Sequence, residues 1–572
     1  MPLPYSEVRQ RWDSEPARDA VNGFELTLTN VSAVTLDLAR AGVDGSRPVE
    51  LRYESDSPAT VTLAGADGTS TPVQVPAGTG TLVVDSAADD GDRGSRDDGG
   101  DAPAVPANPV QPSDTVHQPT VIGPIGDEGI RTREPFFTTL LPLPEDWVEE
   151  EFFFEGVART PEELAIDAEG GTPYRSRIMV RRPTDPADFN GTVIVDWNNV
   201  TVPQDRDVAW HPLYSTLLER GYAYVSVAAQ RLSIEASPLA LKQYDPVRYG
   251  SLTHPGDDYS FDIFSQAAEA VLSTEPSVLG ALRPYLTHRL AMGASQSGSR
   301  LRTYINDVHE HSRVFDGFQP QISSPEGVDR DLVPILWVNS GGEADDQDGT
   351  PPDSGLFRLW EIAGTAHTSH GSSQLMNDNL VWNHSNGMSG PKEEAHDLED
   401  SFAWGYQLDP SQCARENYSV AGLTWSAALV ALDSWVKTGV APEPMPRLAR
   451  DENGRVYDEH GNMVGGVRAP YLDVPIATYY GGDVPDGSLD PCANVGGRMA
   501  LSGYTRVFSA AKLDALYPTA EDYLSQLDAA VDDALAKGFI LPEGAADVRA
   551  RAAGAVAILD RPDAVPTVPG GS

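Results

Sequence analysis

The sequence predicts an α/β protein with a mostly parallel central sheet, joined to a small all-β module at its N-terminus. Beyond residue 115, nearly continuous apolar runs such as 192–197 (TVIVDW) and 223–228 (AYVSVA) alternate with amphipathic helical segments. This pattern is typical of parallel strands that are buried on both faces. Before residue 86, apolar residues recur at every second position between turn residues, which indicates half-buried strands. With 572 residues, the chain is also long enough for two domains.

Residues 1–85 are expected to form the β-rich module, with strand candidates at 24–28, 34–38, 49–53, 61–63 and 82–84. The module has no sequence cluster of histidines, cysteines or paired acids, so a binding or structural role is expected. Residues 86–115 are acidic and rich in Gly and Asp, a composition that favours a solvated linker. Residues 116–572 then form the larger domain, with a lid near 383–406 and a C-terminal helical extension.

Within the larger domain, strands are expected at 177–181, 192–197, 223–228, 290–292, 315–320, 333–338 and 356–362, and helices at 213–220, 259–272, 424–437 and 521–537. The segment 451–462 (DENGRVYDEHGN) resembles a calcium loop but lacks a glutamate at its twelfth position. Its Asn-Gly and His-Gly pairs favour a hairpin instead. His254, Asp257 and Asp258 lack the spacing of metal ligands, so they are expected in a structured loop, and no metal site is predicted.

The formal net charge of -44 argues against nucleic acid or an anionic membrane as a partner, because both would repel the protein. The scarcity of lysine beside abundant aspartate suits a protein that stays dissolved in high salt, although the base composition of a genome produces the same bias. The sequence has neither an export signal nor an apolar run of membrane-spanning length, so we expect a cytoplasmic protein. Cys413 and Cys492 can pair or stay reduced, and the oligomeric state is not determined by the sequence.

The segment LAMGASQSGSRLRTY, residues 290–304, predicts a strand, a tight turn and a helix. A dinucleotide site would need a second glycine where Ser295 stands, and a P-loop would need a lysine after Gly298. The spacing instead fits a nucleophile elbow, with Gly293 two residues before Ser295 and the small Ser297 two residues after it. Only small side chains fit there, because both positions are pressed between strand and helix. Ser295 is therefore the candidate nucleophile.

A nucleophilic serine needs a histidine base, which in turn needs a carboxylate to orient it. When the elbow follows a central strand, the acid and then the histidine follow later strands. His367 comes a few residues after the apolar run 356–362 and is preferred over His370. Glu343 is the first carboxylate after the strand candidate 333–338 and is the preferred acid, with Asp345 as the alternative.

The tetrahedral oxyanion of such a reaction is stabilised by backbone amides. The amide of Gln296 follows the nucleophile at a helix N-terminus. A second amide is expected from the polar turn at residues 198–201, with Asn199 as the candidate.

Several separated stretches carry a resemblance to a known family: 148–156 (VEEEFFFEG), 189–200 (FNGTVIVDWNNV), 219–231 (ERGYAYVSVAAQR), 249–267, 293–298 (GASQSG), 358–367 (RLWEIAGTAH) and 465–479. From about residue 120 onward, the chain resembles the bacterial and archaeal alpha/beta hydrolase domain-containing proteins, a group regarded as serine esterases. The resemblance implies an α/β-hydrolase fold, with Ser295 as nucleophile and His367 as base. Glu343 stands where the family carries an aspartate. The N-terminal β module lies outside the resemblance.

Together these patterns predict a serine hydrolase that cleaves carboxylic esters of small molecules through an acyl-enzyme, with no metal or organic cofactor. Amide or lactone cleavage would use the same residues. A second possibility of a different class is a non-catalytic binding or scaffold protein on the same frame, because a fold does not determine function.

Overall fold

The computed structural model describes residues 23–28, 33–38, 49–55, 59–64, 70–75, 78–84, 106, 108–126, 134–343, 349–368, 417, 421–452, 454–481, 501 and 503–559. Contacts divide the chain into two compact units, Met1–Asp101 and Ala102–Ser572. Most of the expected linker, the expected lid, both cysteines, Asp345 and His370 lie outside the described residues. None of the helices in the described part is both long and apolar enough to cross a bilayer.

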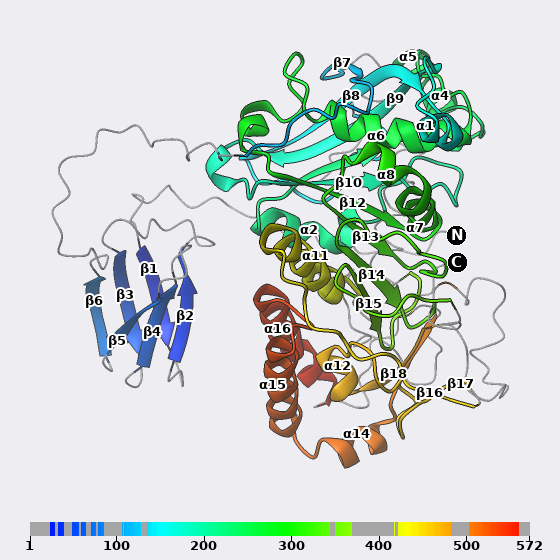
Figure 1. The fold of residues 1–572 in the computed structure, drawn as a ribbon. Helices are drawn as coiled ribbons and strands as arrows, with labels where there is room; N and C mark the ends of the chain where they lie inside the picture. Colours follow the sequence, from blue (N-terminus) through cyan, green and yellow to red (C-terminus); the bar gives the residue numbers. More distant parts are fainter. Residues whose placement is uncertain are drawn as a thin grey trace, which may run out of the picture. The chain divides into compact units, whose positions relative to one another are not determined.

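The N-terminal unit contains two three-stranded sheets (Figure 1). One sheet has the order β1–β3–β6, formed by Gly23–Leu28, Val49–Ser55 and Gly78–Val84. The other has the order β2–β4–β5, formed by Ala33–Asp37, Ala59–Ala64 and Ser70–Val75. One buried apolar cluster contains residues of both sheets, such as Leu51 of β3 and Val61 of β4. The unit is therefore a small β-sandwich.

The second unit is built on a nine-stranded sheet with the order β15–β14–β13–β12–β10–β11–β9–β8–β7. The strands are β7 (Thr120–Ile122), β8 (Trp147–Ala158), β9 (Thr172–Pro183), β10 (Thr192–Trp197), β11 (Ala223–Val227), β12 (His288–Ala294), β13 (Gly317–Gln321), β14 (Ile335–Ser340) and β15 (Phe357–Ile362). The six strands from β11 to β15 pair in parallel. Strands β9, β8 and β7 extend the edge beside β11 in antiparallel fashion.

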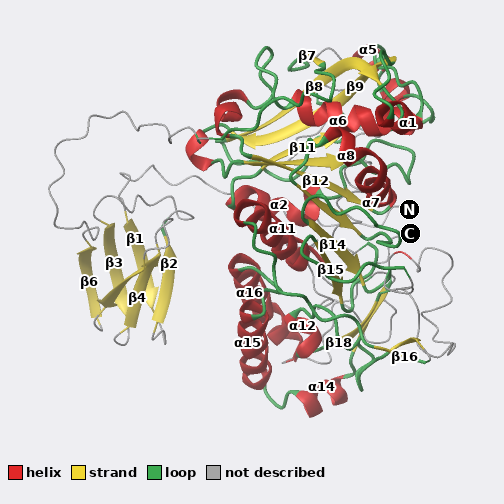
Figure 2. Ribbon diagram, viewed as in Figure 1, coloured by secondary structure: helices red, strands yellow, loops and turns green. Residues whose placement is uncertain are grey.

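Helices cover both faces of this sheet (Figure 2), and the alternation of side chains along β10 shows how. Val193 and Val195 belong to the buried cluster that contains residues of α6 (Ser260–Ala270) and α7 (Gln296–Thr303). Ile194 belongs instead to the cluster that contains α2 (Trp210–Glu219) and α11 (Ala421–Thr438). Since neighbouring strand residues point to opposite faces, an uninterrupted apolar strand is needed to fill both layers.

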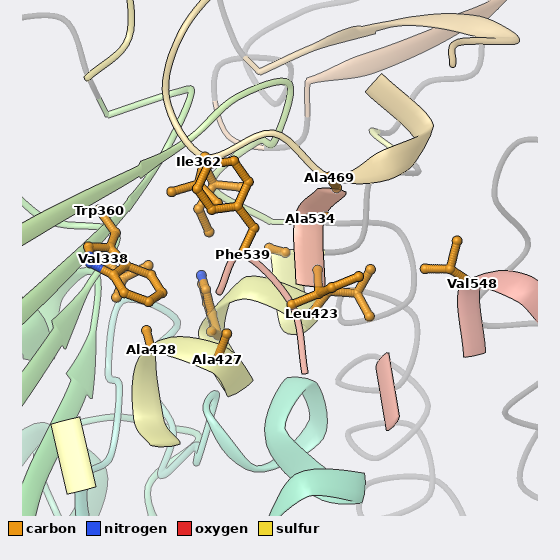
Figure 3. Packing of buried hydrophobic residues seen from close by; sticks show 14 of the residues in the cluster. Val338, Trp360, Ile362, Leu423, Ala427, Ala428, Ala469, Ala534, Phe539 and Val548 are labelled. Atoms are coloured by element: carbon orange, nitrogen blue, oxygen red, sulfur yellow. The ribbon is translucent and has the colours of Figure 1, made fainter. Parts of the chain in front are cut away.

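The other α-helices in the described part of this unit are short or lie towards the C-terminus. They are α1 (Pro161–Ala165), α3 (Arg231–Ile234), α4 (Leu241–Tyr244), α5 (Pro246–Tyr249), α8 (His309–Ser312), α12 (Pro470–Asp473), α14 (Ala510–Leu516), α15 (Ala520–Ala536) and α16 (Pro542–Leu559), with a π-helical turn, η4 (Tyr304–Val308), between α7 and α8. Residues of α11, α15 and α16 share one core with Trp360 of β15, as Figure 3 shows for Leu423, Ala534 and Val548.

The expected strands and helices of the larger unit are found within a few residues of their predicted positions, and the predicted mostly parallel sheet is confirmed. The segment 451–462 contains the expected hairpin, in which β16 (Arg450–Asp451) pairs with β17 (Gly454–Arg455). Strand β9 is much longer than the predicted 177–181. It pairs with β8 along its whole length, and its residues Arg177 and Arg181 are buried in ion pairs.

Candidate active site

Ser295 stands at the sharp turn between β12 and α7. Its backbone has φ 61° and ψ -118°, a conformation that costs a non-glycine residue free energy and is found mainly at functional sites. The Ser295 amide donates to the Gln321 carbonyl of the neighbouring strand β13 at 2.9 Å. This bond fixes the turn at the carboxyl end of the sheet, and the side chain of Ser295 lines a pocket there.

The turn leaves no room for side chains at its flanking positions. A Cβ at Gly293 would lie 3.0 Å from the carbonyl oxygen of Ser297, and one at Gly298 would lie 2.4 Å from Ser323 Oγ. Ser297 is buried, and its hydroxyl donates to the Ala294 carbonyl at 2.9 Å and accepts from the Ala294 amide at 3.0 Å. Ser297 stands where the motif prefers glycine, and its hydroxyl therefore links the turn to the end of β12.

His367 lies in the turn after β15 and contacts Ser295 directly. Its Nε2 is 2.8 Å from Ser295 Oγ, and its Nδ1 is hydrogen bonded to Glu343 Oε1. The two side chains of this histidine and glutamate are 16% and 15% exposed. The carboxylate accepts a hydrogen bond from Nδ1–H, which leaves Nε2 as the acceptor for the serine hydroxyl. The structure thus brings together the three residues that the sequence nominated, from the ends of β12, β14 and β15.

The turn that presents Glu343 depends on two glycines after β14. A Cβ at Gly341 would lie 2.6 Å from Met463 Sδ, and one at Gly342 would lie 2.6 Å from the Gly481 carbonyl oxygen. Ser340 Oγ accepts from the Gly342 amide at 3.0 Å and donates to Glu343 Oε2. Both oxygens of the carboxylate are therefore hydrogen bonded.

The two expected oxyanion donors differ in their surroundings. Gln296 is the first residue of α7, where backbone amides point towards the helix end. The Asn199 amide, by contrast, donates to the Arg206 carbonyl at 2.7 Å. The assignment of Asn199 as a backbone donor is therefore corrected. Its side chain instead donates to the Ala294 carbonyl at 2.9 Å and accepts from the Thr201 amide at 2.9 Å, so Asn199 ties its loop to the end of β12.

A family model described as "Alpha/beta hydrolase domain" matches residues 118–550, well over half of the chain. The chain belongs to this family. Its larger unit has the α/β-hydrolase fold, as the sequence resemblance implied. No curated protein sequence was found to match the chain.

Solved structures similar to this α/β hydrolase include esterases and peptidases. Esterase Est22 aligns with 11% identity and a TM-score of 0.23, over 34% of this chain and 64% of the esterase. A structure from a study of two prolyl endopeptidases aligns with 11% identity and a TM-score of 0.24, over 45% of this chain and 39% of the peptidase. Oligopeptidase B from Leishmania major aligns with 13% identity and a TM-score of 0.19, over 32% of this chain and 21% of that protein. The aligned part spans under two thirds of each relative, and TM-scores this low carry no inference about substrate.

The α/β hydrolase has a cavity of about 150 Å³ beside the serine and the histidine. The loop after β10 contributes polar residues to its wall, including Thr201 and Arg206, while α11 contributes Ala421 and Trp425. Most other lining residues that the structure describes are apolar. The cavity therefore offers an apolar volume for part of a substrate next to the Ser295 hydroxyl.

The sequence interpretation did not identify the wall residues Arg206 and Trp425. A signal for Arg206 was present in the alternation of Asp205, Arg206 and Asp207, because alternating residues of an extended segment point to opposite sides. Trp425 lies in a helix that was predicted, but no local pattern shows which turn of that helix faces a cavity. His254 lies in the structured loop that was expected, with Nε2 2.8 Å from the Ala229 carbonyl oxygen and Nδ1 accepting from the Gly256 amide.

Proposed function

We propose that this α/β hydrolase cleaves carboxylic esters through a covalent acyl-enzyme on Ser295. The observation that carries the proposal is the continuous hydrogen-bonded row from Ser295 Oγ through His367 to Glu343. Such a row activates a hydroxyl that is otherwise a weak nucleophile at neutral pH.

In the first half of the reaction, His367 Nε2 takes the proton of the Ser295 hydroxyl while Oγ attacks the ester carbonyl. Glu343 stabilises the imidazolium that forms. The Gln296 amide is the proposed donor to the oxyanion, aided by the positive end of α7. When the tetrahedral intermediate collapses, the ester bond breaks and the imidazolium gives its proton to the departing alcohol.

In the second half, His367 removes a proton from water, and the resulting hydroxide attacks the acyl group on Ser295. Collapse of the second intermediate returns the proton to Ser295 Oγ and releases the carboxylic acid. The second oxyanion donor is expected from the loop after β10. The amides of Val200 and Val202 are the candidates, because the amides of Asn198, Asn199 and Thr201 donate to other acceptors.

The test uses a fluorophosphonate probe and a chromogenic acetate ester with the full-length chain. The wild type should be labelled and should hydrolyse the ester, whereas Ser295→Ala should lose labelling and lower kcat by about a millionfold if the three residues act as a unit. Ser299→Ala is the matched control, because Ser299 is an exposed serine one turn along α7. A wild type that neither reacts with the probe nor cleaves esters would favour the non-catalytic alternative.

The same residues can cleave an amide or a lactone. A panel of esters, anilides and lactones that share one acyl group would separate these reactions. Ester cleavage is the expected preference, because an alcohol leaves more easily than an amine. An anilide cleaved faster than its matched ester would replace the ester assignment with an amidase.

A further inference from the structure

Ile322, in the described wall of the cavity beside Ser295, has a backbone conformation that a β-branched residue seldom adopts. It follows β13 directly, and its φ is 42°. This left-handed region disfavours side chains that branch at Cβ, so the conformation costs folding free energy. The residue is buried and lines the cavity. A strained residue in the wall of a candidate active site indicates a role in what the cavity holds.

Hydrogen bonds fix the chain at Ile322 and on both sides of it. The Ile322 amide donates to a carbonyl of β14 at 2.8 Å, and the Gln321 carbonyl accepts from the Ser295 amide at 2.9 Å. The Ser323 amide donates to Asn339 Oδ1 at 3.1 Å. A strained conformation persists only where the surroundings hold it in this way. Because Gln321 also holds the turn of the nucleophile, the backbone of Ile322 is fixed relative to that of Ser295.

Two helices contribute further apolar residues to the cavity wall. Helix α2 provides Pro212, and α11 provides Ala421 and Trp425. A Cβ at Gly422 would lie 2.6 Å from the Pro212 carbonyl oxygen, so the backbones of the two helices are in close contact beside the cavity. Ile322 belongs to the same buried cluster as Ala421 and Trp425. A wall packed in this way changes shape little, so the cavity has a nearly fixed volume.

The mechanism separates the two ends of an ester substrate. The oxygen of the leaving alcohol has to face His367 Nε2, which supplies its proton, so the acyl chain points away from this histidine. The loop after β10, α2 and α11 line the cavity through Val208, Pro212 and Trp425, and these elements are separate from the turn that carries His367. These observations favour the acyl chain as the group that enters the cavity.

We propose that the cavity is an acyl pocket whose length is set by Ile322, so that the preferred substrates are esters of short aliphatic acids. This inference rests on the proposed ester hydrolysis at Ser295. The cavity measures about 150 Å³, a volume that holds a group the size of benzene. Unbranched acyl chains of about four to six carbons match it. A longer chain must displace packed side chains, which costs more than burial of the added carbons gains.

The test measures kcat/KM of the full-length chain for p-nitrophenyl esters of unbranched acids from acetate to decanoate. For the wild type, the value should rise about fourfold with each CH2 that enters the pocket. It should reach a maximum at an acyl chain of about six carbons or fewer and then fall about tenfold or more. Ile322→Ala shortens the side chain in the wall and should move this maximum about two carbons towards longer chains.

Ile335→Ala is the matched control. Ile335 is a buried isoleucine at the start of β14, and it belongs to the core cluster on the other face of the sheet. The same truncation there should leave the position of the maximum unchanged. Thermal melting of each variant checks folding. If an alanine variant does not fold, Ile322→Val and Ile335→Val replace the pair, with an expected shift of about one carbon for the first and none for the second.

A wild type whose kcat/KM still rises at decanoate would overturn the inference. So would a maximum that Ile322→Ala moves no further than Ile335→Ala does. A second series keeps a butanoyl group and lengthens the alcohol. Ile322→Ala should leave the profile of that series unchanged, and a shift there would refute the assignment of the cavity to the acyl chain.

Binding of 2-alkanones of increasing length tests the pocket without catalysis, because a ketone has no ester bond to break. Calorimetry measures this binding to Ser295→Ala with and without Ile322→Ala. A length limit that moves with Ile322→Ala would support the pocket even if no ester were cleaved, in which case the proposed function alone would fail. Ketone binding without a length limit would refute the pocket and leave the proposed function intact.

Discussion

Replacing Glu343 by glutamine tests which carboxylate orients His367. The substitution keeps the shape of the side chain, so Ser340 and His367 retain a partner of similar size. What disappears is the negative charge beside the imidazolium that forms during the reaction. Two unit charges about 4 Å apart at an effective dielectric constant of about 20 attract each other by about 4 kcal/mol, which corresponds to about a thousandfold in rate.

The glutamine has a second way to impair the reaction. If its amide group faces His367 Nδ1, the imidazole must carry its proton on Nε2 and can no longer accept from Ser295, a defect of about 10⁴-fold in kcat. We therefore expect Glu343→Gln to lower kcat between a thousandfold and ten thousandfold, with a much smaller change in KM. Steady-state hydrolysis of p-nitrophenyl acetate measures both constants.

Asp345→Asn is the control, because Asp345 is the alternative acid in the same stretch of sequence. It should keep the activity of the wild type, and thermal melting of both variants checks that each is folded. If Asp345→Asn lost activity a thousandfold while Glu343→Gln kept more than about a tenth of it, the assignment of the acid would be refuted.

Three further substitutions test other parts of the structure. Ser297→Ala removes the hydroxyl that bonds the buried Ala294 amide and should lower the free energy of unfolding in urea by about 1 to 3 kcal/mol; an unchanged value would contradict that role. Gly342→Ala should push the turn away from the Gly481 carbonyl and lower kcat by about 100-fold, the effect of displacing a catalytic group by about 1 Å; full activity would show that the turn tolerates a side chain. Burial and nearby positive charges lower the pKa of His211 to about 3, so the unfolded chain takes up a proton below about pH 6.5 while the native imidazole stays neutral. This residue should therefore cost about 1.4 kcal/mol of stability for each unit that the pH falls from 6.5 towards 3, and His211→Phe should show a shallower loss in urea titrations at pH 6 and pH 4.5.

The sheet could be predicted from the sequence because its central strands are buried on both faces. Val193, Ile194 and Val195 predict a parallel strand, because a short, continuous apolar segment between helices is typical of one. The elbow could also be predicted from neighbouring residues, because a single turn requires small residues at positions 293 and 297. The choice of His367 and Glu343 used the order of strands along the chain, and the family resemblance also implied His367. The structure places both in one hydrogen-bonded row with Ser295. Their catalytic role stays a prediction.

What could not be predicted depends on contacts between distant segments. The Asn199 amide was nominated as a donor because it follows a strand, but its bond to Arg206 arises from a loop that turns back on itself. The burial of Arg177 and Arg181 in β9 depends on carboxylates from strand β8 and from the loop after β10. These partners are distant in sequence, so the local pattern does not show it. The cavity is lined by residues as far apart in sequence as Asn199, Trp425 and Leu501. A local periodicity in the sequence does not predict which distant residues line one cavity.

The bond between Thr368 and Leu501 has a consequence for how the enzyme is made. The Thr368 amide, next to His367, donates to the Leu501 carbonyl at 2.9 Å, and Leu501 also lines the cavity. Ser295 leaves the ribosome about two hundred codons before Leu501 does, at roughly 5 to 20 residues per second. A nascent chain stalled before residue 501 therefore has its nucleophile but lacks both the anchor beside its base and part of its binding wall. Hydrolytic activity should begin only after residue 501 of this hydrolase has been translated.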